Sequence, residues 1–151
     1  MIEIALFQPD IAPNAATLLR LAACLGIRVR IIEPAGFVLS DAQFRRAGMD
    51  YVDKAALIRD ASWEAFRRAT AGRRLVLLTT KATLPYGDFT FRDGDILLMG
   101  RESAGVPDHV HQAADARITI PMRQGMRSIN VALACAMVTG EALRQLRSFP
   151  Q

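Results

Sequence analysis

The sequence predicts an α/β fold with a mainly parallel sheet flanked by helices. Short apolar runs typical of buried parallel strands recur along the chain, and segments with helical periodicity separate them. This alternation, without an internal repeat, is typical of strands joined by helical crossovers. The 151 residues suffice for one domain with its own core, so we expect a single domain over 1–151.

The first part of the chain predicts strands and helices in turn. Apolar residues recur at helical spacing after the first strand, until a glycine ends the helix. The predicted elements, in order, are a strand Ile2–Phe7, a helix Ile11–Leu25 ended by Gly26, a strand Val29–Ile32, a short helix capped by Asp41 that carries Arg45 and Arg46, and a less regular segment through Tyr51.

The second part continues the alternation. Ser62 is a good capping residue for the helix that follows it. The predicted elements are a helix to about Ala71, strands Leu75–Thr79 and Ile96–Met99, a short helix from Pro107-Asp108, a strand Arg117–Ile120 closed by Pro121, and a long helix from Ser128 or Ile129.

The last helix organises the chain. Every residue from Val131 to Val138 is apolar, which predicts a helix buried on all sides. Ala132, Ala136 and Gly140 fall at i, i+4 and i+8, and small residues at this spacing allow another backbone to approach closely. We expect this helix to be central to the fold and to a subunit contact.

The charge of the chain permits a polyanionic partner. The net charge is only +4, but the cations are almost all arginine, with Lys54 and Lys81 the only lysines. Arginine suits phosphate recognition better than lysine does. A genome that favours arginine codons gives the same composition, so composition alone leaves both explanations open.

Other features concern the compartment. No apolar run reaches the length of a membrane helix, and the N-terminus lacks the basic start of a signal peptide. Cys24 and Cys135 both lie in apolar helical surroundings, as free buried thiols of a reducing compartment do. We therefore expect a cytoplasmic protein with no membrane partner.

Three loops are candidates for a ligand site. They follow Leu78, Met99 and Ile120, and ligands of open α/β sheets bind beyond the carboxyl ends of the strands. The middle loop, from Gly100 to Pro107, lacks both the phosphate-binding lysine of a P-loop and the glycine spacing of a dinucleotide site. Taken alone, it is also compatible with an ordinary turn.

Single polar residues add two further candidates. Asn14 at a helix start is compatible with an ordinary N-cap, and Arg20 on an otherwise apolar helix is compatible with a solvent-facing residue. His109 and His111 point to different sides of a helix, and no Cys or His set has zinc spacing. We expect no metal and no nucleophilic triad.

These pieces together resemble the SPOUT superfamily of RNA methyltransferases, and within it the minimal tRNA wobble-nucleotide 2′-O-ribose methyltransferases. The resemblance spans nearly the whole chain and departs from the family pattern at Ala16, Arg101 and Ala104. The matching stretches are Gln8-Pro9-Asp10-Ile11-Ala12-Pro13-Asn14 through Leu19-Arg20, then Thr79-Thr80-Lys81, then Leu98 to Pro107, then Ile120-Pro121-Met122 with Arg127-Ser128-Ile129-Asn130, and finally Glu141 to Gln145.

The resemblance implies a C-terminal trefoil knot and S-adenosylmethionine held by the knotted loops. It implies methyl transfer to a ribose 2′-hydroxyl of tRNA at wobble position 34, by a homodimer with shared sites. The implied catalytic residues are Arg20, Asn14 and Glu102, and the implied cofactor-binding residues are Leu78, Thr79, Gly100, Glu102, Ile120, Met122, Ser128 and Asn130.

Arg20 is expected to act as a cation that orients the hydroxyl, since a guanidinium loses its proton only at extreme pH. The arginines expected to hold tRNA phosphates are Arg28, Arg30, Arg45, Arg46 and Arg123. The alternatives are another tRNA position, ribosomal RNA, or a non-catalytic RNA-binding protein of the same fold. A nucleotide-dependent oxidoreductase is disfavoured by the missing dinucleotide fingerprint.

Overall fold

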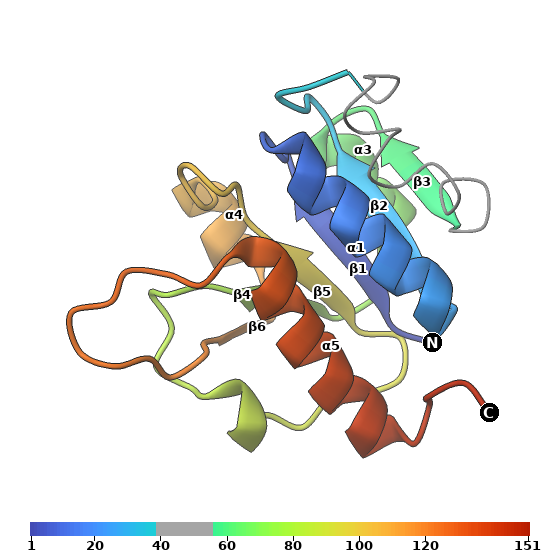
Figure 1. The fold of residues 1–151 in the computed structure, drawn as a ribbon. Helices are drawn as coiled ribbons and strands as arrows, with labels where there is room; N and C mark the ends of the chain where they lie inside the picture. The colour runs from blue at the N-terminus through green and yellow to red at the C-terminus, as the bar shows by residue number, and fades with distance from the viewer. Residues whose placement is uncertain (39–55) are drawn as a thin grey trace.

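The structure, a computed structural model, describes residues 1–38 and 56–151. Strands and helices alternate along most of the chain (Figure 1). The elements are β1 Glu3–Phe7, α1 Ala12–Leu25, β2 Arg28–Ile32, β3 Leu57–Asp60, α3 Trp63–Ala69, β4 Leu75–Leu78, the 3-10 turn η1 Tyr86–Asp88, β5 Ile96–Met99, α4 Asp108–Ala113, β6 Ala116–Ile118 and α5 Val131–Leu146.

The six strands form one sheet in the order β3-β2-β1-β5-β4-β6, and every neighbouring pair is parallel. This confirms the predicted α/β class. From β1 the chain proceeds outward to β2 and β3, whereas β5 lies on the opposite side of β1. The direction of winding therefore changes between β1 and β5, and the carboxyl ends of strands beside such a change form a ligand crevice.

Two apolar layers cover the sheet. Alternate residues of β1 face opposite ways, because successive side chains of a strand point to opposite faces. Ile4 and Leu6 pack in the core beneath α1 and α5, and Ala5 and Phe7 pack in a second core with Phe66 of α3 and residues of α4. Figure 1 shows α1 and α5 side by side on one face of the sheet.

The local capping residues explain where the main helices begin and end. Gly26 ends α1 in the left-handed conformation at φ 68°, as predicted. Ser62 accepts a hydrogen bond from the backbone N–H of Ala65 and begins α3, also as predicted. For α5 the predicted start was two or three residues early, because the side chain of Asn130 caps the helix and Val131 is its first residue.

Two strands differ from the prediction. β3 was missed, because it has four residues and only Leu57 and Ile58 are apolar. β6 ends at Ile118, earlier than predicted. Thr119 instead bonds through its backbone to Leu84 and Tyr86, which removes it from the ladder with β4. The predicted helix after Asp41, with Arg45 and Arg46, and the segment through Tyr51 lie outside the described residues.

The prediction that α5 is buried on all sides was wrong. Leu133 is 61% exposed and Met137 is 42% exposed, one turn apart on the same side of the helix. Beyond the helix's own neighbouring backbone, no heavy atom of residues 1–38 and 56–151 lies within 4 Å of a Cβ placed on Gly140, so no other described segment approaches closely there. Cys24 was also predicted to be buried and is exposed, whereas Cys135 is buried as expected.

An ion-pair network runs across the sheet from the amino end of β1 to the carboxyl end of β3. Arg30 of β2 donates to Glu3 of β1 and, through Nη1 at 3.0 Å, to both carboxylate oxygens of Asp60 of β3. Arg73 adds a contact of 2.8 Å to Glu3. Because Arg30 is buried within the sheet, its predicted contact with RNA phosphate is wrong.

Candidate active site

A pocket of about 430 Å³ lies at the carboxyl ends of β4, β5 and β6. The three loops predicted from the sequence all line it, together with the start of α1 and the start of α5. This volume is within the range of small-molecule sites. Its lining includes all eight predicted cofactor-binding residues, namely Leu78, Thr79, Gly100, Glu102, Ile120, Met122, Ser128 and Asn130.

Backbone hydrogen bonds fix the loops relative to one another. Thr79 donates its N–H to the carbonyl of Ile118 at 3.0 Å, which joins the loop after β4 to the end of β6. Tyr86 then donates to the carbonyl of Thr119 at 2.8 Å. The walls of the pocket are therefore tied together by main-chain contacts.

The loop after β5 folds back on itself beside the pocket. Arg101 and Gly105 exchange two backbone hydrogen bonds of 2.9 Å, and a Cβ on Gly100 would lie 2.9 Å from the Cα of Gly105. Gly105 itself has φ 64°, a conformation that favours glycine. Close backbone approach thus requires glycine at Gly100, and the loop is more than an ordinary turn.

A polar chain crosses the pocket wall from β5 to α5. Asn14 donates from Nδ2 to Oε1 of Glu102 at 3.4 Å, and Asn130 donates from Nδ2 to Oδ1 of Asn14 at 3.1 Å. Asn130 in turn accepts from the N–H groups of Ala132 and Leu133. Asn14 is therefore no N-cap: Ile11 occupies that position in α1, and the Asn14 side chain serves the site.

Glu102 lies beside a second carboxyl group that sequence reasoning did not single out. The backbone N–H of Asp10 donates to Oε2 of Glu102 at 3.3 Å, and Ser103 donates its hydroxyl to the Asp10 carboxylate. Burial, reinforced by the Asp10 side chain, raises the pKa of Glu102 above its ordinary value. The hydrogen bond with Glu102 lowers the pKa of Asp10.

Arg20 does not line the pocket of its own chain. It is exposed on α1, six residues beyond Asn14. That separation corresponds to about 9 Å along the helix axis and about 240° around it. The structure brings Asn14 and Glu102 together but places Arg20 elsewhere on the surface.

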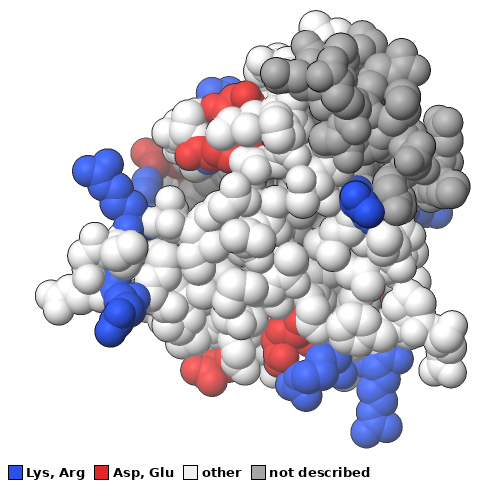
Figure 2. Space-filling model, viewed as in Figure 1, with Lys and Arg blue, Asp and Glu red and all other residues white. Residues whose placement is uncertain are grey.

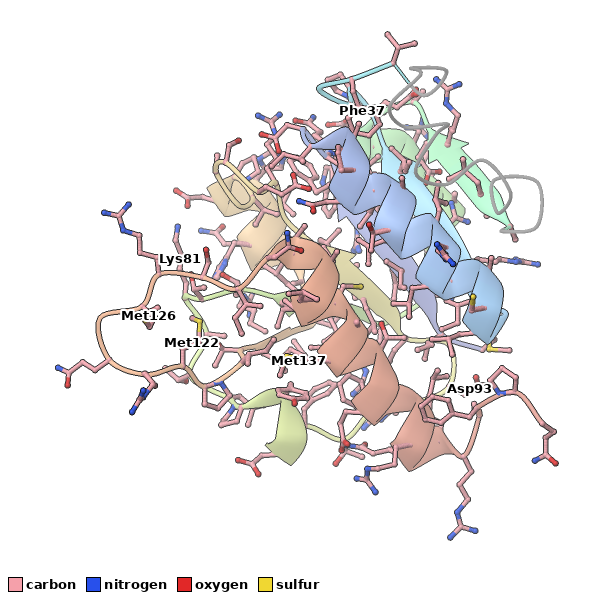
Figure 3. All side chains as sticks on the ribbon, viewed as in Figure 1. Phe37, Lys81, Asp93, Met122, Met126 and Met137 are labelled. Carbon is pink, nitrogen blue, oxygen red and sulfur yellow. The ribbon has the colours of Figure 1, made fainter. Side chains whose placement is uncertain are left out.

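Exposed basic side chains stand on two of the loops that line the pocket. Lys81, Arg123 and Arg127 are exposed, and none of the ion pairs found in residues 1–38 and 56–151 includes them. Figure 3 shows Met122 and Met126 on the loop between β6 and α5, and Met126 is 67% exposed. Lysine and arginine side chains project from this end of the molecule (Figure 2).

The described residues include neither a metal-ligand cluster nor a membrane-spanning helix. No group of three or more His, Cys, Asp or Glu side chains that could hold a metal ion was found among them. None of the helices in the described part of the chain is long and apolar enough to cross a membrane.

Comparisons with known proteins agree with these features. Residues 1–140 match the SpoU rRNA Methylase family. A tRNA (cytidine(34)-2'-O)-methyltransferase of Beijerinckia indica subsp. indica is 66% identical over 145 residues, which are 95% of this chain and 91% of that protein. A protein with the same name from Escherichia coli (strain K12) is 41% identical and covers 97% of this chain and 94% of its own length.

Solved structures share the fold. One, described as "Structural insights into the 2-OH methylation of C/U34 on tRNA", has a TM-score of 0.93, 37% sequence identity and coverage of 97% of both chains. An AdoMet-bound rRNA methyltransferase from Sinorhizobium meliloti has a TM-score of 0.87 and 27% identity, and the match covers 96% of this chain and 56% of that chain. The resemblance inferred from the motifs is confirmed: the chain belongs to the SpoU methylase family of RNA methyltransferases.

Proposed function

We propose that this protein transfers a methyl group from S-adenosylmethionine to the ribose 2′-hydroxyl of nucleotide 34 in tRNA. The observation that carries the proposal is the pocket at the carboxyl ends of β4, β5 and β6, whose lining brings together the residues of three separated sequence motifs. The names of relatives that match almost the full chain supply the substrate. We place the enzyme in the cytoplasm, where tRNA is modified.

The pocket fits an adenosine derivative. Leu78, Met99 and Ile120 provide an apolar slot, while Thr79 and Ser128 provide polar groups at its edge. The backbone approach at Gly100 removes side-chain bulk from the floor. The bound methyl donor supplies an electrophilic methyl group on a sulfonium, and the protein's own residues hold the acceptor oxygen in line with it.

The catalytic work assigned to this chain is positioning and charge stabilisation. Glu102 and Asn14 hold one another at the pocket wall, and Asn130 fixes Asn14 to the start of α5. Arg20 orients the 2′-hydroxyl and stabilises the alkoxide that develops as the proton leaves. It acts as a cation and not as a base, because its guanidinium stays protonated.

We propose that the active unit is a homodimer with composite sites. Arg20 lies outside the pocket of its own chain, whereas an apolar strip with Leu133 and Met137 is exposed on the neighbouring helix. The surface over α1 and α5 carries few charged side chains in Figure 2. A two-fold contact through this face would place Arg20 of each chain at the pocket of the other.

Exposed cations on the loops beside the pocket are proposed to hold tRNA phosphates. Lys81, Arg123 and Arg127 come from two of the three loops that line the pocket, and Arg28, at the amino end of β2, is a further exposed arginine. Binding through such contacts should weaken steeply as salt increases, because each neutralised phosphate releases counterions.

Methyl transfer to purified RNAs tests the proposal. The protein, S-adenosylmethionine labelled in the methyl group, and tRNA from a deletion strain should give 2′-O-methylation at nucleotide 34, mapped by nuclease digestion and mass spectrometry. Label that appears at another tRNA position or only in ribosomal RNA would overturn the substrate. Binding of tRNA without any transfer would favour a non-catalytic RNA-binding protein.

A further inference from the structure

The loop after β1 and the loop after β5 are held together by side-chain contacts at one edge of the pocket. Arg101 donates from Nη2 to the side chain of Gln8, and Ser103 donates its hydroxyl to Asp10. A third contact runs from the backbone N–H of Asp10 to Glu102 at 3.3 Å. Asp10 therefore bonds to two successive residues of the loop that carries Glu102.

The carboxyl groups of Asp10 and Glu102, here called the carboxyl pair, are neighbours, because the backbone N–H of Asp10 donates to Oε2 of Glu102 and the hydroxyl of Ser103, the next residue, donates to Oδ2 of Asp10. Two ionised carboxylates are both acceptors and repel one another. Oδ1 of Asp10 is also buried and has no hydrogen-bond partner among the described residues. One proton held between the two groups removes the repulsion and turns one acceptor into a donor.

The surroundings of the carboxyl pair supply few other charges. Arg101 is the other charged side chain among the described residues that line the pocket, and Gln8 binds its guanidinium. From α1 the neutral amide of Asn14 faces Glu102. On the other side the backbone of Gly36 packs against Asp10, since a Cβ placed on Gly36 would lie 2.9 Å from the Cα of Asp10.

We propose that Asp10 is a positioning residue for the methyl transfer: it shares a proton with Glu102 and thereby holds Glu102 against Asn14 at the pocket wall. The assignment rests on the proposed function and adds a residue to it. Asp10 does not itself line the pocket, so it acts through Glu102. From Glu102 the contact continues through Asn14 and Asn130 to the start of α5.

The shared proton gives the role a pH dependence with a definite sign. Burial and the neighbouring Asp10 raise the pKa of Glu102, so the protonated pair persists above the ordinary range of a carboxyl. When the pH rises through that raised pKa, the proton leaves and the carboxylates repel each other. Glu102 then moves away from Asn14, and the activity of wild type falls relative to that of Asp10→Asn, in which the two side chains do not repel each other.

Two substitutions separate this role from a merely structural one. Asp10→Asn retains the shape and replaces the shared proton with an amide donor, so below the raised pKa of Glu102 it should stay within about threefold of wild type. Its rate relative to wild type should then rise as the pH increases. Asp10→Ala removes both contacts and should lower kcat by tenfold or more, since misplacement near a reacting centre has effects of that size.

Two further variants test whether the effect is specific to Asp10: one should have no effect, and the other should act through Asp10. Asp88→Asn changes an exposed aspartate of η1 that does not line the pocket, and it should leave the pH profile unchanged. Gly36→Ala alters neither carboxyl group but pushes on Asp10, and it should lower kcat as Asp10→Ala does. Equal kcat and equal pH profiles for wild type, Asp10→Asn and Asp10→Ala would overturn the proposal.

A titration that needs no substrate separates this inference from the proposed function. In protein labelled with ¹³C at glutamate carboxyls, Glu102 should titrate above its ordinary range, and it should shift downward in Asp10→Asn. An unchanged titration of Glu102 in that variant would overturn the shared proton. If the titration shifts as expected but wild type methylates no RNA, the proposed function fails while the carboxyl pair stands.

Discussion

At the scale of single residues, Gly100 is a pocket position where neighbouring backbone leaves no room for a side chain. Gly100→Ala would place a Cβ 2.9 Å from both the Cα and the carbonyl carbon of Gly105, and backbone cannot move aside as a side chain can. We expect a cost of about 1–3 kcal/mol from overpacking, seen as weaker cofactor binding and slower transfer. Calorimetry with S-adenosylhomocysteine measures the binding loss.

Gly87→Ala is the matched control for that substitution. Gly87 is exposed, and no heavy atom lies within 4 Å of a Cβ placed there. The affinity of the Gly87→Ala variant for S-adenosylhomocysteine should equal that of wild type. Equal affinities for all three proteins would show that the loop after β5 can yield at Gly100.

Arg30 is a second residue whose role the structure defines. Arg30→Met leaves Asp60 without its bidentate partner in a buried site, so we expect a loss of about 3–5 kcal/mol in the free energy of unfolding. tRNA affinity should not change for the fraction that is folded, because Arg30 does not reach the surface. Urea denaturation and a salt series of binding assays measure the two quantities.

The same network predicts how stability depends on pH. Burial opposes the charge of Glu3, but hydrogen bonds from Arg73 and Arg30 outweigh it and lower the pKa of Glu3 below its ordinary value of 4.5. Glu3 therefore contributes stability above pH 4.5, and the contribution is lost as pH falls through the lower folded-state pKa. In Arg30→Met, acid unfolding should begin at higher pH than in wild type.

The family resemblance, carried by the sequence motifs, predicted the pocket lining but not the partners of individual side chains. Asn14 and Asn130 are 116 residues apart, and no local pattern reports that their amides bond to each other. For the same reason Arg30 looked like a surface cation, although Asp60 neutralises it inside the sheet. Asp10 belonged to a matching motif, and only its place beside Glu102 gives it a role.

At the scale of elements, the exposed strip of α5 is the feature that demands a partner. Leu133→Glu would place a charge in the proposed two-fold contact, where burial of an unpaired carboxylate is costly. We expect the dimer dissociation constant to rise by tenfold or more, which corresponds to about 1.4 kcal/mol or more. Sedimentation equilibrium over a range of concentrations measures it.

Leu84→Glu provides the comparison for this strip. Leu84 is 40% exposed and lies on neither α1 nor α5, so the same charge there should leave the dissociation constant unchanged. A wild-type protein that sediments as a monomer at all concentrations would exclude the homodimer.

Elements with strong periodicity or a clear capping residue were predictable, and weak ones were not. Gly26 and Ser62 mark the end of α1 and the start of α3, because each satisfies backbone groups that the helix leaves open. β3 lacked a signal, since its pairing with β2 compensates for a short and mixed sequence. The exposed side of α5 could not be predicted, because an apolar run does not show whether its residues are buried within the same chain or by another chain.

At the scale of the whole molecule, a composite site predicts recovery of activity in mixed dimers. Arg20→Ala removes the proposed cation, and Ser128→Tyr blocks the pocket of its own chain, so each variant alone should be inactive. A mixed dimer carries both lesions in one site and neither in the other. Mixing the variants with exchange of subunits should therefore restore up to about a quarter of wild-type activity per chain, because half of the dimers are mixed and each has one intact site of two.

The dependence of activity on the ratio of the two variants checks this prediction. Activity should peak at equal amounts of the two variants and follow the statistical fraction of mixed dimers. Inactivity at every ratio, with subunit exchange demonstrated by a tagged chain, would mean that each chain holds a complete site.

The class of the fold followed from alternation of strands and helices, but its topology did not. Nothing in local periodicity places β5 beside β1 or β6 beside β4. The trefoil knot stays a prediction that rests on family membership, since crossings of a chain in space leave no mark on hydrophobic spacing.

The position of β1 at the middle of the sheet has a consequence for synthesis on the ribosome. β1 is made first, and β2 can cover one of its edges early, but the other edge pairs with β5, which begins at Ile96. Until those later residues emerge, the apolar β1 exposes an unpaired edge of the kind that invites aggregation. The nascent chain should therefore depend on chaperones until β5 has been translated, and truncated chains that end before β5 should accumulate as insoluble protein.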